Sequence, residues 1–560
     1  MRSIALITST TVCFFGLSLP VLTQVNQIPS TIEPTRPNPP LPSKLPSSTP
    51  LPFNLDEPSP EIPLEPFEVE DTVIVRKIEV LGSTVFSKEE LNEVVKPFIN
   101  KSLTFEQVLA IRSAVTNLYV SRGYNTSGAF LPFQDFTEGN LRVQVVEGEI
   151  ENLEIRGLRR LRQSYVISRL AAATKAPVNF PQLEQALQLL QLNPLFSKID
   201  VELTAGSSPG RNDLIVSLTE ANPLSGAIVV DNKEPPSVGS FGSTASFSHN
   251  NFLGLGDRLT AALGLTEGVN SYLLNYTIPL NARDGTLSLG YDNGRNRVVE
   301  QPFEPIGIRG KSQSYSISFR QPIVRTPTEE IALSLSTDLR QSRTFLLDDE
   351  PFSFTEGPEN GKSKVSVLRF TQDWTKRSSS SVLAARSHLS VGLDVFGATT
   401  NDTGTDGRFV SWLGQFQWVQ SLNTKREAVL VSNLAAQLTP DSLLPLEQFA
   451  IGGANSVRGY RTNQAVASNG FFGSIEARFP VVREESGFGL IQLTPFIDVG
   501  SIWGDNSSEM LLSTGLGVRW QLSNAFSARL DWGIPLISKV RLGDSLQDNG
   551  ISFSLQVNPF

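Results

Sequence analysis

The pattern of apolar and polar residues along this chain of 560 residues changes near residue 224. Before that point, short alternating stretches flank segments whose apolar residues recur at helical spacing. After it, helical spacing disappears and alternating segments recur to the end, most clearly at residues 286–291, 314–319 and 551–558. Glycine, asparagine, aspartate and proline separate these segments. The pattern predicts an α+β region followed by an all-β region of about 16 strands.

The α+β region repeats one order of elements, over residues 71–149 and again over residues 150–222. The first unit predicts a strand at 73–81, helices at 88–95 and 105–122, and a strand at 141–146. The second predicts a strand at 150–155, helices at 165–173 and 183–192, and strands at 199–203 and 214–218. Two consecutive units of this kind predict two small α+β modules.

Two neighbouring segments of the all-β region carry an acidic residue on their polar side. In residues 471–479 the odd positions are mostly apolar and the even positions include Glu476, and in residues 491–500 the even positions include Asp498. If such strands close into a membrane barrel, the apolar face meets lipid and the polar face lines a wet lumen. Residues 223–560 therefore predict a barrel in which Glu476 and Asp498 face the lumen.

A glycine-rich segment precedes these strands. Residues 452–460 hold Arg458 among glycines, in a stretch too long and irregular for a simple turn. We expect Arg458 to fold inward and meet Glu476, Asp498 or both, because a guanidinium stays charged and donates paired hydrogen bonds to a carboxylate. Water should screen such a pair, so its value would be to hold the loop in one register. The alternative is a solvated loop charge and two ordinary lumen residues.

These residues coincide with a known pattern. The loop segment resembles the VRGY/F signature in the sixth extracellular loop of outer-membrane polypeptide transporters, and it consists of Val457, Arg458, Gly459 and Tyr460. The second strand resembles the F-x-D-x-G motif of that superfamily through Phe496, Asp498 and Gly500, and Glu476 matches its strand glutamate. Within the superfamily the chain is most similar to the TpsB transporters of two-partner secretion, of the ShlB/FhaC/HecB haemolysin secretion/activation type.

The two predicted α+β modules resemble POTRA domains, and residues 121–124 and 146–150 resemble the TpsB version of the first one. The resemblance implies an outer-membrane β-barrel of 16 antiparallel strands with both modules in the periplasm. It also implies that the modules capture an unfolded exoprotein, a TpsA-like client, through exposed strand edges, and that the barrel exports it. The expected surroundings are outer-membrane lipid. No cofactor, nucleotide or nucleic acid is implied.

The two ends of the chain carry candidate targeting signals. Residues 1–24 predict a secretory signal peptide with an apolar run after Arg2, and the only cysteine, Cys13, lies in that run without a convincing lipobox. Residues 25–70 hold 13 of the 36 prolines and predict an extended linker, or alternatively a docking arm. At the other end, Phe560 resembles the terminal aromatic read by the barrel-assembly machinery, although it could be a simple strand residue.

Composition and charge argue against other classes of function. The net charge of −9 and the lack of a basic run disfavour nucleic-acid binding. The two histidines, His249 and His388, lie in strand-like segments outside any metal or catalytic-triad pattern, so we predict no enzyme activity. Three alternatives stay open: an insertase for other barrel proteins, a passive porin, and an adhesin or enzyme built on a soluble β-sandwich.

Overall fold

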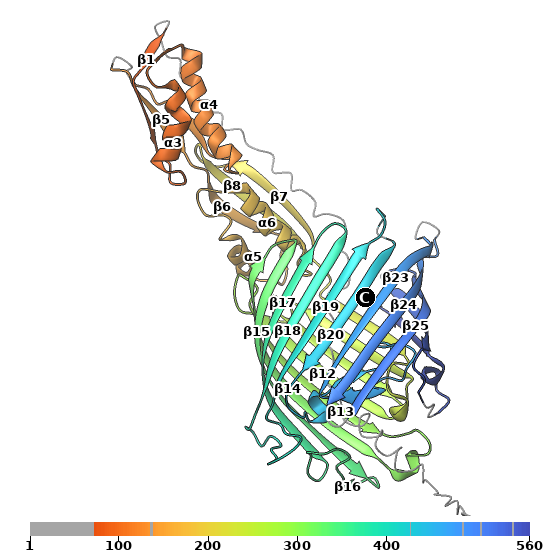
Figure 1. The fold of residues 1–560 in the computed structure, drawn as a ribbon. Coiled ribbons are helices and arrows are strands. Elements are labelled where there is room, and N and C mark those ends of the chain that lie inside the picture. Colours follow the sequence, from red (N-terminus) through yellow and green to blue (C-terminus); the bar gives the residue numbers. More distant parts are fainter. Residues whose placement is uncertain (1–71, 135–137, 426, 484–486, 505–506, 540–542) are drawn as a thin grey trace, which may run out of the picture.

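The computed structural model describes residues 72–134, 138–425, 427–483, 487–504, 507–539 and 543–560. The predicted signal peptide, Cys13 and the proline-rich segment lie outside the described residues. Figure 1 shows two α+β modules extending from one end of a β-barrel, with the first module farther from the barrel than the second. The predicted fold class is therefore confirmed.

The first module packs two helices on small sheets. Its elements are β1 (Val73–Val75), β2 (Lys77–Leu81), α3 (Lys88–Val95), β3 (Lys101–Leu103), α4 (Phe105–Ser121), β4 (Gly128–Phe130) and β5 (Asn140–Val146). Capping boxes start both helices, with Ser87 before α3 and Thr104 before α4. The apolar face of α4 packs with the buried side chains of β5. The single strand predicted at 73–81 is wrong, because β1 pairs with β3 whereas β2 pairs in parallel with β5.

The second module repeats this plan in a three-stranded sheet of order β6-β8-β7. Its elements are β6 (Glu149–Arg156), α5 (Gln163–Leu170), α6 (Phe180–Gln191), β7 (Phe196–Ala205) and β8 (Arg211–Glu220). Helix α6 begins three residues before its predicted start, because Asn179 caps it and Pro181 suits its first turn. Leu183 and Leu187 of α6 pack with Leu214 and Val216 of β8 in the core of the module.

Sixteen long antiparallel strands close the barrel, and β27 pairs with β9 to complete it. They are β9 (Leu224–Asp231), β10 (Gly242–Asn250), β11 (Arg258–Thr266), β12 (Val269–Pro279), β13 (Thr286–Arg297), β14 (Arg309–Arg325), β15 (Glu329–Leu346), β17 (Lys362–Arg377), β18 (Ser381–Leu393), β19 (Val410–Ser421), β20 (Val429–Leu438), β23 (Asn469–Val482), β24 (Leu490–Gly504), β25 (Ser507–Gln521), β26 (Phe526–Pro535) and β27 (Ile551–Val557). The two-residue β16 (Glu350–Pro351) extends a loop at the end far from the modules (Figure 1).

Short 3-10 helices punctuate the connections. They are η1 (Lys96–Phe98), η2 (Pro236–Val238), η3 (Glu304–Ile306), η4 (Pro445–Glu447) and η6 (Leu546–Asn549). Among the described residues, none of the helices is both long and apolar enough to cross a membrane.

The alternation of the barrel strands separates an apolar outer face from a polar inner one. On β14, Tyr315, Ile317 and Phe319 point outward and are exposed. On β23 and β24, Ile475 and Ile497 are exposed outward while Glu476 and Asp498 are buried on the inner side. The strand period thus assigns each residue to its face, as the sequence pattern predicts.

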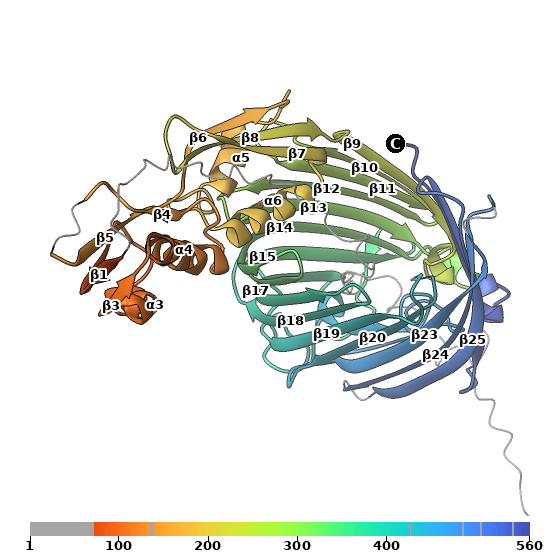
Figure 2. The same cartoon turned by 90° about the horizontal axis from the view of Figure 1, so that it is seen from above.

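The connection between β20 and β23 turns back into the barrel (Figure 2). These are the eleventh and twelfth barrel strands, so this connection, residues 439–468, occupies the predicted position of the sixth loop. We call it the inner loop. It contains η4 and a small hairpin, β21 (Phe449–Ile451) and β22 (Ala465–Ala467), whose apolar side chains pack with Phe472 and Ile502 of the barrel wall.

Candidate functional site

Glycines shape the tip of the inner loop. Gly459 has a φ of +89°, which is readily adopted only by residues without a Cβ, and its backbone contacts Gly533 of β26 in the barrel wall. A Cβ at Gly459 would lie 2.8 Å from the carbonyl carbon of Gly533, so the two backbones approach too closely for any side chain. This contact presses the tip against the wall and aims Arg458 at β23 and β24.

Arg458 binds Asp498 in a bidentate arrangement. Its Nε donates to Oδ2 at 2.7 Å and its Nη2 donates to Oδ1 at 2.8 Å, while its backbone N–H donates to Oδ2 at 3.1 Å. The hydroxyl of Ser474 on β23 donates to Oδ1 at 2.6 Å and accepts from Nη2 of Arg458 at 3.1 Å. One aspartate therefore fixes both the side chain and the backbone of Arg458.

Glu476 completes the arginine's coordination. Nη1 of Arg458 donates to its Oε2 at 2.5 Å. Two wall arginines share the same carboxylate, since Arg478 donates to Oε1 at 2.8 Å and Arg529 to Oε2 at 2.7 Å. Arg529 also donates to Asp531, which lies 3.9 Å from Arg458. The structure thus brings Arg458, Glu476 and Asp498 into one ionic network, which we call the tip anchor.

The tip anchor is shielded from water, which corrects the expectation of a screened pair. Arg458 is 4% exposed and Asp498 is fully buried. The guanidinium carbon lies 3.5 Å from the ring centroid of Phe496, so the aromatic of the F-x-D-x-G motif stacks on the arginine. Breaking a buried pair leaves an uncompensated charge, and the cost of that is several kcal/mol rather than the fraction of one found at surfaces.

The other motif residues pack the loop on the wall. Val457 is fully buried, and a Cβ at Gly500 would lie 2.8 Å from its Cγ2, so Gly500 makes room for it. The hydroxyl of Tyr460 lies 2.8 Å from the carbonyl oxygen of Leu512 and 2.9 Å from that of Ile537, so its one proton is shared between these two acceptors. All motif residues from 457 to 460 therefore contact the barrel wall.

The remaining sequence candidates lie elsewhere. Phe560 follows β27 near Gly226 of β9, is 56% exposed, and does not join the tip anchor. His388 of β18 exchanges a hydrogen bond of 2.6 Å with Thr371, and His249 of β10 lies 3.4 Å from Arg160 of the second module.

Comparisons with known proteins agree with this architecture. A family model described as haemolysin secretion/activation protein ShlB/FhaC/HecB matches residues 210–520, which is more than half of the chain. The chain belongs to the ShlB/FhaC/HecB family. A model described as POTRA domain, ShlB-type, matches residues 73–148.

Individual relatives have low sequence identity to this chain, but the similarity extends over most of its length. The chain is 24% identical to the outer membrane transporter CdiB of Dickeya dadantii over 416 residues, 71% of each protein. It is 21% identical to the heme/hemopexin transporter protein HuxB of Haemophilus influenzae over 399 residues, 68% of this chain and 67% of HuxB. The structure of CdiB from Escherichia coli superposes with a TM-score of 0.68 at 21% identity, covering 88% of this chain and 93% of CdiB.

This ShlB-type protein is therefore an outer-membrane β-barrel transporter of two-partner secretion, with its N-terminal region in the periplasm. The end of the barrel beside the modules is the periplasmic end. The inner loop leaves from the opposite, extracellular end.

Sequence reasoning missed a second ionic network at the base of the inner loop of this ShlB-type barrel. Glu447 of η4 accepts hydrogen bonds from Arg369 of β17 at 2.7 Å and from Arg340 of β15 at 3.1 Å. Arg369 also donates to Asp338 at 2.5 Å and to Ser390 at 2.9 Å. We call this set the base anchor. Its residues are far apart in sequence. Only the inward parity of the strand residues, such as Arg340 and Arg369, could have suggested part of this set.

A third set of contacts ties the loop to the extracellular rim. Arg461 donates to Asp548 at 2.6 Å and 2.8 Å and to Glu300 at 3.1 Å. Thr462 donates its backbone N–H to Gln547 at 2.8 Å and its hydroxyl to the carbonyl oxygen of Lys233 at 2.7 Å. The part of the loop after the tip is thereby held across the junction of β27 and β9.

Polar contacts also join the second module to the periplasmic turns of the barrel. Arg169 of α5 stacks on Tyr165 and donates to Asp284, in the turn after β12, at 2.9 Å from Nε. Arg162 donates its backbone N–H to the carbonyl oxygen of Gly254, in the turn after β10, at 3.1 Å. These contacts set the angle between module and barrel.

Glu220 at the end of β8 orders the segment that reaches the barrel. Its Oε1 accepts hydrogen bonds of 2.9 Å from the backbone N–H groups of Arg159, Arg160 and Leu161. Burial works against ionisation of this carboxyl, but the backbone donors outweigh it and lower the pKa of Glu220 below its ordinary value.

Proposed function

We propose that residues 71–149 and 150–222 form two POTRA modules that capture an unfolded, TpsA-like exoprotein in the periplasm and deliver it to the barrel of residues 223–560. Each module sheet ends in edge strands, β2 and β4 in the first and β6 and β7 in the second. An extended client can add to such an edge through backbone hydrogen bonds, which need no particular client sequence.

The inner loop organises the lumen through which the client passes. The single observation that carries this proposal is the bidentate binding of Arg458 to Asp498 in a buried site, with Glu476 on the remaining guanidinium nitrogen. A buried network of this kind specifies one loop position, because other positions leave charges unpaired. We infer that the tip anchor defines the resting conformation of the lumen.

The proposed transport uses binding and passage, without catalysis, a nucleotide or a cofactor. Phe560 at the end of the last strand would serve as the signal for the barrel-assembly machinery during biogenesis. Secretion is preferred over the insertase because of the family to which the chain belongs. A passive porin would leave the meeting of the three motif pieces in one network unexplained.

Deletion of the gene tests this proposal. The exported proteins of mutant and parent would be compared by mass spectrometry, while the abundance of outer-membrane barrels is measured in the same cells. We expect the loss of one or a few large exoproteins with normal barrel levels, and the lost proteins identify the client. A general fall in barrel proteins would contradict the secretion proposal and favour the insertase.

A further inference from the structure

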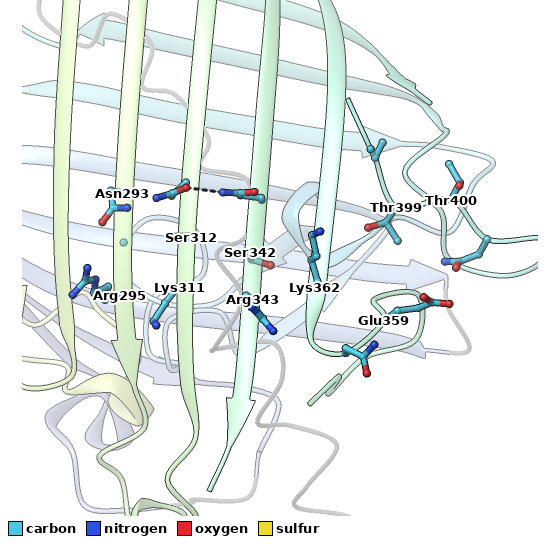
Figure 3. A pocket seen from close by; sticks show the side chains of 17 residues that line it. Asn293, Arg295, Lys311, Ser312, Ser342, Arg343, Glu359, Lys362, Thr399 and Thr400 are labelled. Carbon is cyan, nitrogen blue, oxygen red and sulfur yellow. Dashed lines mark hydrogen bonds between the residues drawn. The ribbon is translucent and has the colours of Figure 1, made fainter. Parts of the chain in front are cut away.

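Four cationic residues form a row across four adjacent strands near the extracellular end of the barrel. Arg295 of β13 pairs with Lys311 of β14, Lys311 pairs with Arg343 of β15, and Arg343 pairs with Lys362 of β17. Figure 3 shows these labelled side chains along one line across the strands. Directly paired residues have Cβ atoms about 5 Å apart, and like charges at that spacing destabilise a sheet.

Strand parity places this row on the outer face of the barrel. Lys311 shares its side of β14 with the exposed Tyr315 and Ile317, and Arg343 lies on the opposite side of β15 from the inward-facing Asp338 and Arg340. The row therefore faces the surrounding membrane rather than the lumen.

The row lies at the height of lipid headgroups. Tyr291 and Tyr315 are paired across β13 and β14 with ring centroids 5.1 Å apart, and such outward tyrosines mark the interface of a membrane barrel. Lys311 is four residues beyond Tyr315 toward the extracellular end, which is about 13 Å along the strand. Strand tilt reduces that height, so the cations reach the headgroup layer above the hydrocarbon.

The cations surround a cleft of about 770 Å³. Amide and hydroxyl groups complete its lining, including Gln313, which accepts a hydrogen bond of 2.6 Å from Gln341. Glu359 is the one carboxylate among the described lining residues, against four cations. Within the part of the chain that the structure describes, none of the four makes a salt bridge, whereas nearby Arg309 pairs with Asp348 at 2.8 Å.

Phe345 orients the centre of the row. Its ring is mostly buried, with Nζ of Lys311 at 5.1 Å and the guanidinium carbon of Arg343 at 5.3 Å from its centroid. Both cations are thus positioned by a rigid aromatic rather than by a carboxylate, which leaves their hydrogen-bond donors available to a ligand.

We propose that this cleft binds the phosphate-bearing headgroup of a lipid in the outer leaflet of the outer membrane. A phosphate offers several acceptor oxygens and a negative charge, and it would relieve the repulsion within the cationic row. The site fastens β13, β14, β15 and β17 to the surrounding lipid, on the strands that also hold Arg340 and Arg369 of the base anchor.

Native mass spectrometry of the purified, detergent-solubilised full chain tests the proposal. The protein would be titrated with lipid A carrying two phosphates, with dephosphorylated lipid A, and with phosphatidylglycerol. We expect the phosphorylated lipids to bind and dephosphorylated lipid A not to. Preference for lipid A over phosphatidylglycerol would identify a glycolipid as the source, and equal binding would identify any anionic lipid; both results support a phosphate site.

The variant for this test combines Lys311→Gln with Arg343→Gln. We expect it to bind the phosphorylated lipids about 30-fold more weakly, because each surface cation contributes roughly a tenfold gain in lipid affinity or less. The matched control is Lys376→Gln, an exposed lysine at the periplasmic end of β17, which should bind as the parent does. The conservative pair Lys311→Arg with Arg343→Lys should retain binding. Unchanged binding by the glutamine variant, equal binding of dephosphorylated lipid A, or an equal loss in Lys376→Gln would overturn the proposal.

Discussion

The two anchors of the inner loop use the same chemistry with opposite polarity. At the tip, the loop supplies the cation, Arg458, and the wall supplies the acids Asp498 and Glu476. At the base, the loop supplies the acid, Glu447, and the wall supplies the cations Arg369 and Arg340. Both loop side chains are almost fully buried. The loop is therefore held at two points that cannot exchange partners, because each would meet like charge at the other.

The difference lies in what remains when an anchor is broken. If Glu447 is lost, Arg369 keeps its own bonds to Asp338 and Ser390. If Asp498 is lost, Arg458 retains Glu476 and the 3.1 Å hydrogen bond from its Nη2 to Ser474. Its Nε, its Nη2 and its backbone N–H all lose the carboxylate that they share. The free energy holding the loop should therefore depend more on the tip than on the base.

Removal of Asp498 should have the largest effect on the loop. In Asp498→Ala, a buried guanidinium loses its bidentate partner, at a cost on the order of 3 kcal/mol. The sequence has a single cysteine, Cys13, in the predicted signal peptide, so a cysteine introduced at the buried Val457 reports opening of the tip. We expect maleimide labelling of Val457→Cys to accelerate about 100-fold when Asp498→Ala is added.

Asp373→Ala is the matched control for that experiment. Asp373 faces the lumen and pairs with the wall residue Arg386 at 2.6 Å, away from the inner loop. Labelling at position 457 should be unchanged in this variant. An equal acceleration in both variants would mean that the loss of any lumen charge opens the barrel, and the tip anchor would have no special role.

Substitution of Gly459 should have the next largest effect. Gly459→Ala must place a Cβ against the backbone of Gly533 at a φ of +89°, which combines a steric clash with an unfavourable backbone conformation. We expect this change to lower the free energy that holds the loop tip on the wall by roughly 2 kcal/mol. Labelling of Val457→Cys should then be about 30-fold faster. Gly487→Ala is the control, since its φ is +79° and no atom lies within 4 Å of the added Cβ.

Removal of Glu447 should have a smaller effect, confined to the base anchor. Glu447→Ala should cost about 1.5 kcal/mol, because the wall arginines lose a charged acceptor but Arg369 keeps Asp338. We expect about tenfold faster labelling of a cysteine at the buried Leu444, with little change at Val457. Equal opening at both positions would show that the loop detaches as one unit and that the two anchors are not independent.

Acidification should give the smallest effect, at the junction of module and barrel. The pKa of Glu220 is lowered in the folded protein, so its contribution is present above the unfolded pKa of about 4.3 and is lost as pH falls through the lower folded value. We expect limited proteolysis near residues 159–161 to increase below about pH 4 in the parent. Glu220→Gln should show this sensitivity already at pH 7, with less further change on acidification.

Strand periodicity could predict the barrel and the inward side of Glu476 and Asp498, because both follow from local alternation. The break between β1 and β2 could not be predicted in the same way, since it comes from a change of pairing partner. The hairpin of the inner loop was missed for a similar reason: its strands have three residues each and form on the wall.

The same distinction between local pattern and long-range contact applies to the candidate site. Arg458 could be singled out from its glycine-rich setting, but Glu447 and Arg369 are brought together only when the barrel closes around the loop. The burial of the tip anchor likewise depends on Phe496 and on the packing of the hairpin, which a strand pattern does not contain. Periodicity assigns a residue to a face, whereas long-range packing decides what covers it.

Export by an Arg458→Ala variant tests most directly whether the tip anchor is needed for transport. The amount of exoprotein in the medium would be compared with the amount of folded barrel in the outer membrane, measured by heat-modifiable gel mobility, with Arg408→Ala as an exposed control whose partner is Asp406. We predict that Arg458→Ala lowers export at least tenfold, at roughly 1.4 kcal/mol per factor of ten, while folded barrel persists. Normal export by Arg458→Ala would contradict the assignment of the tip anchor to transport.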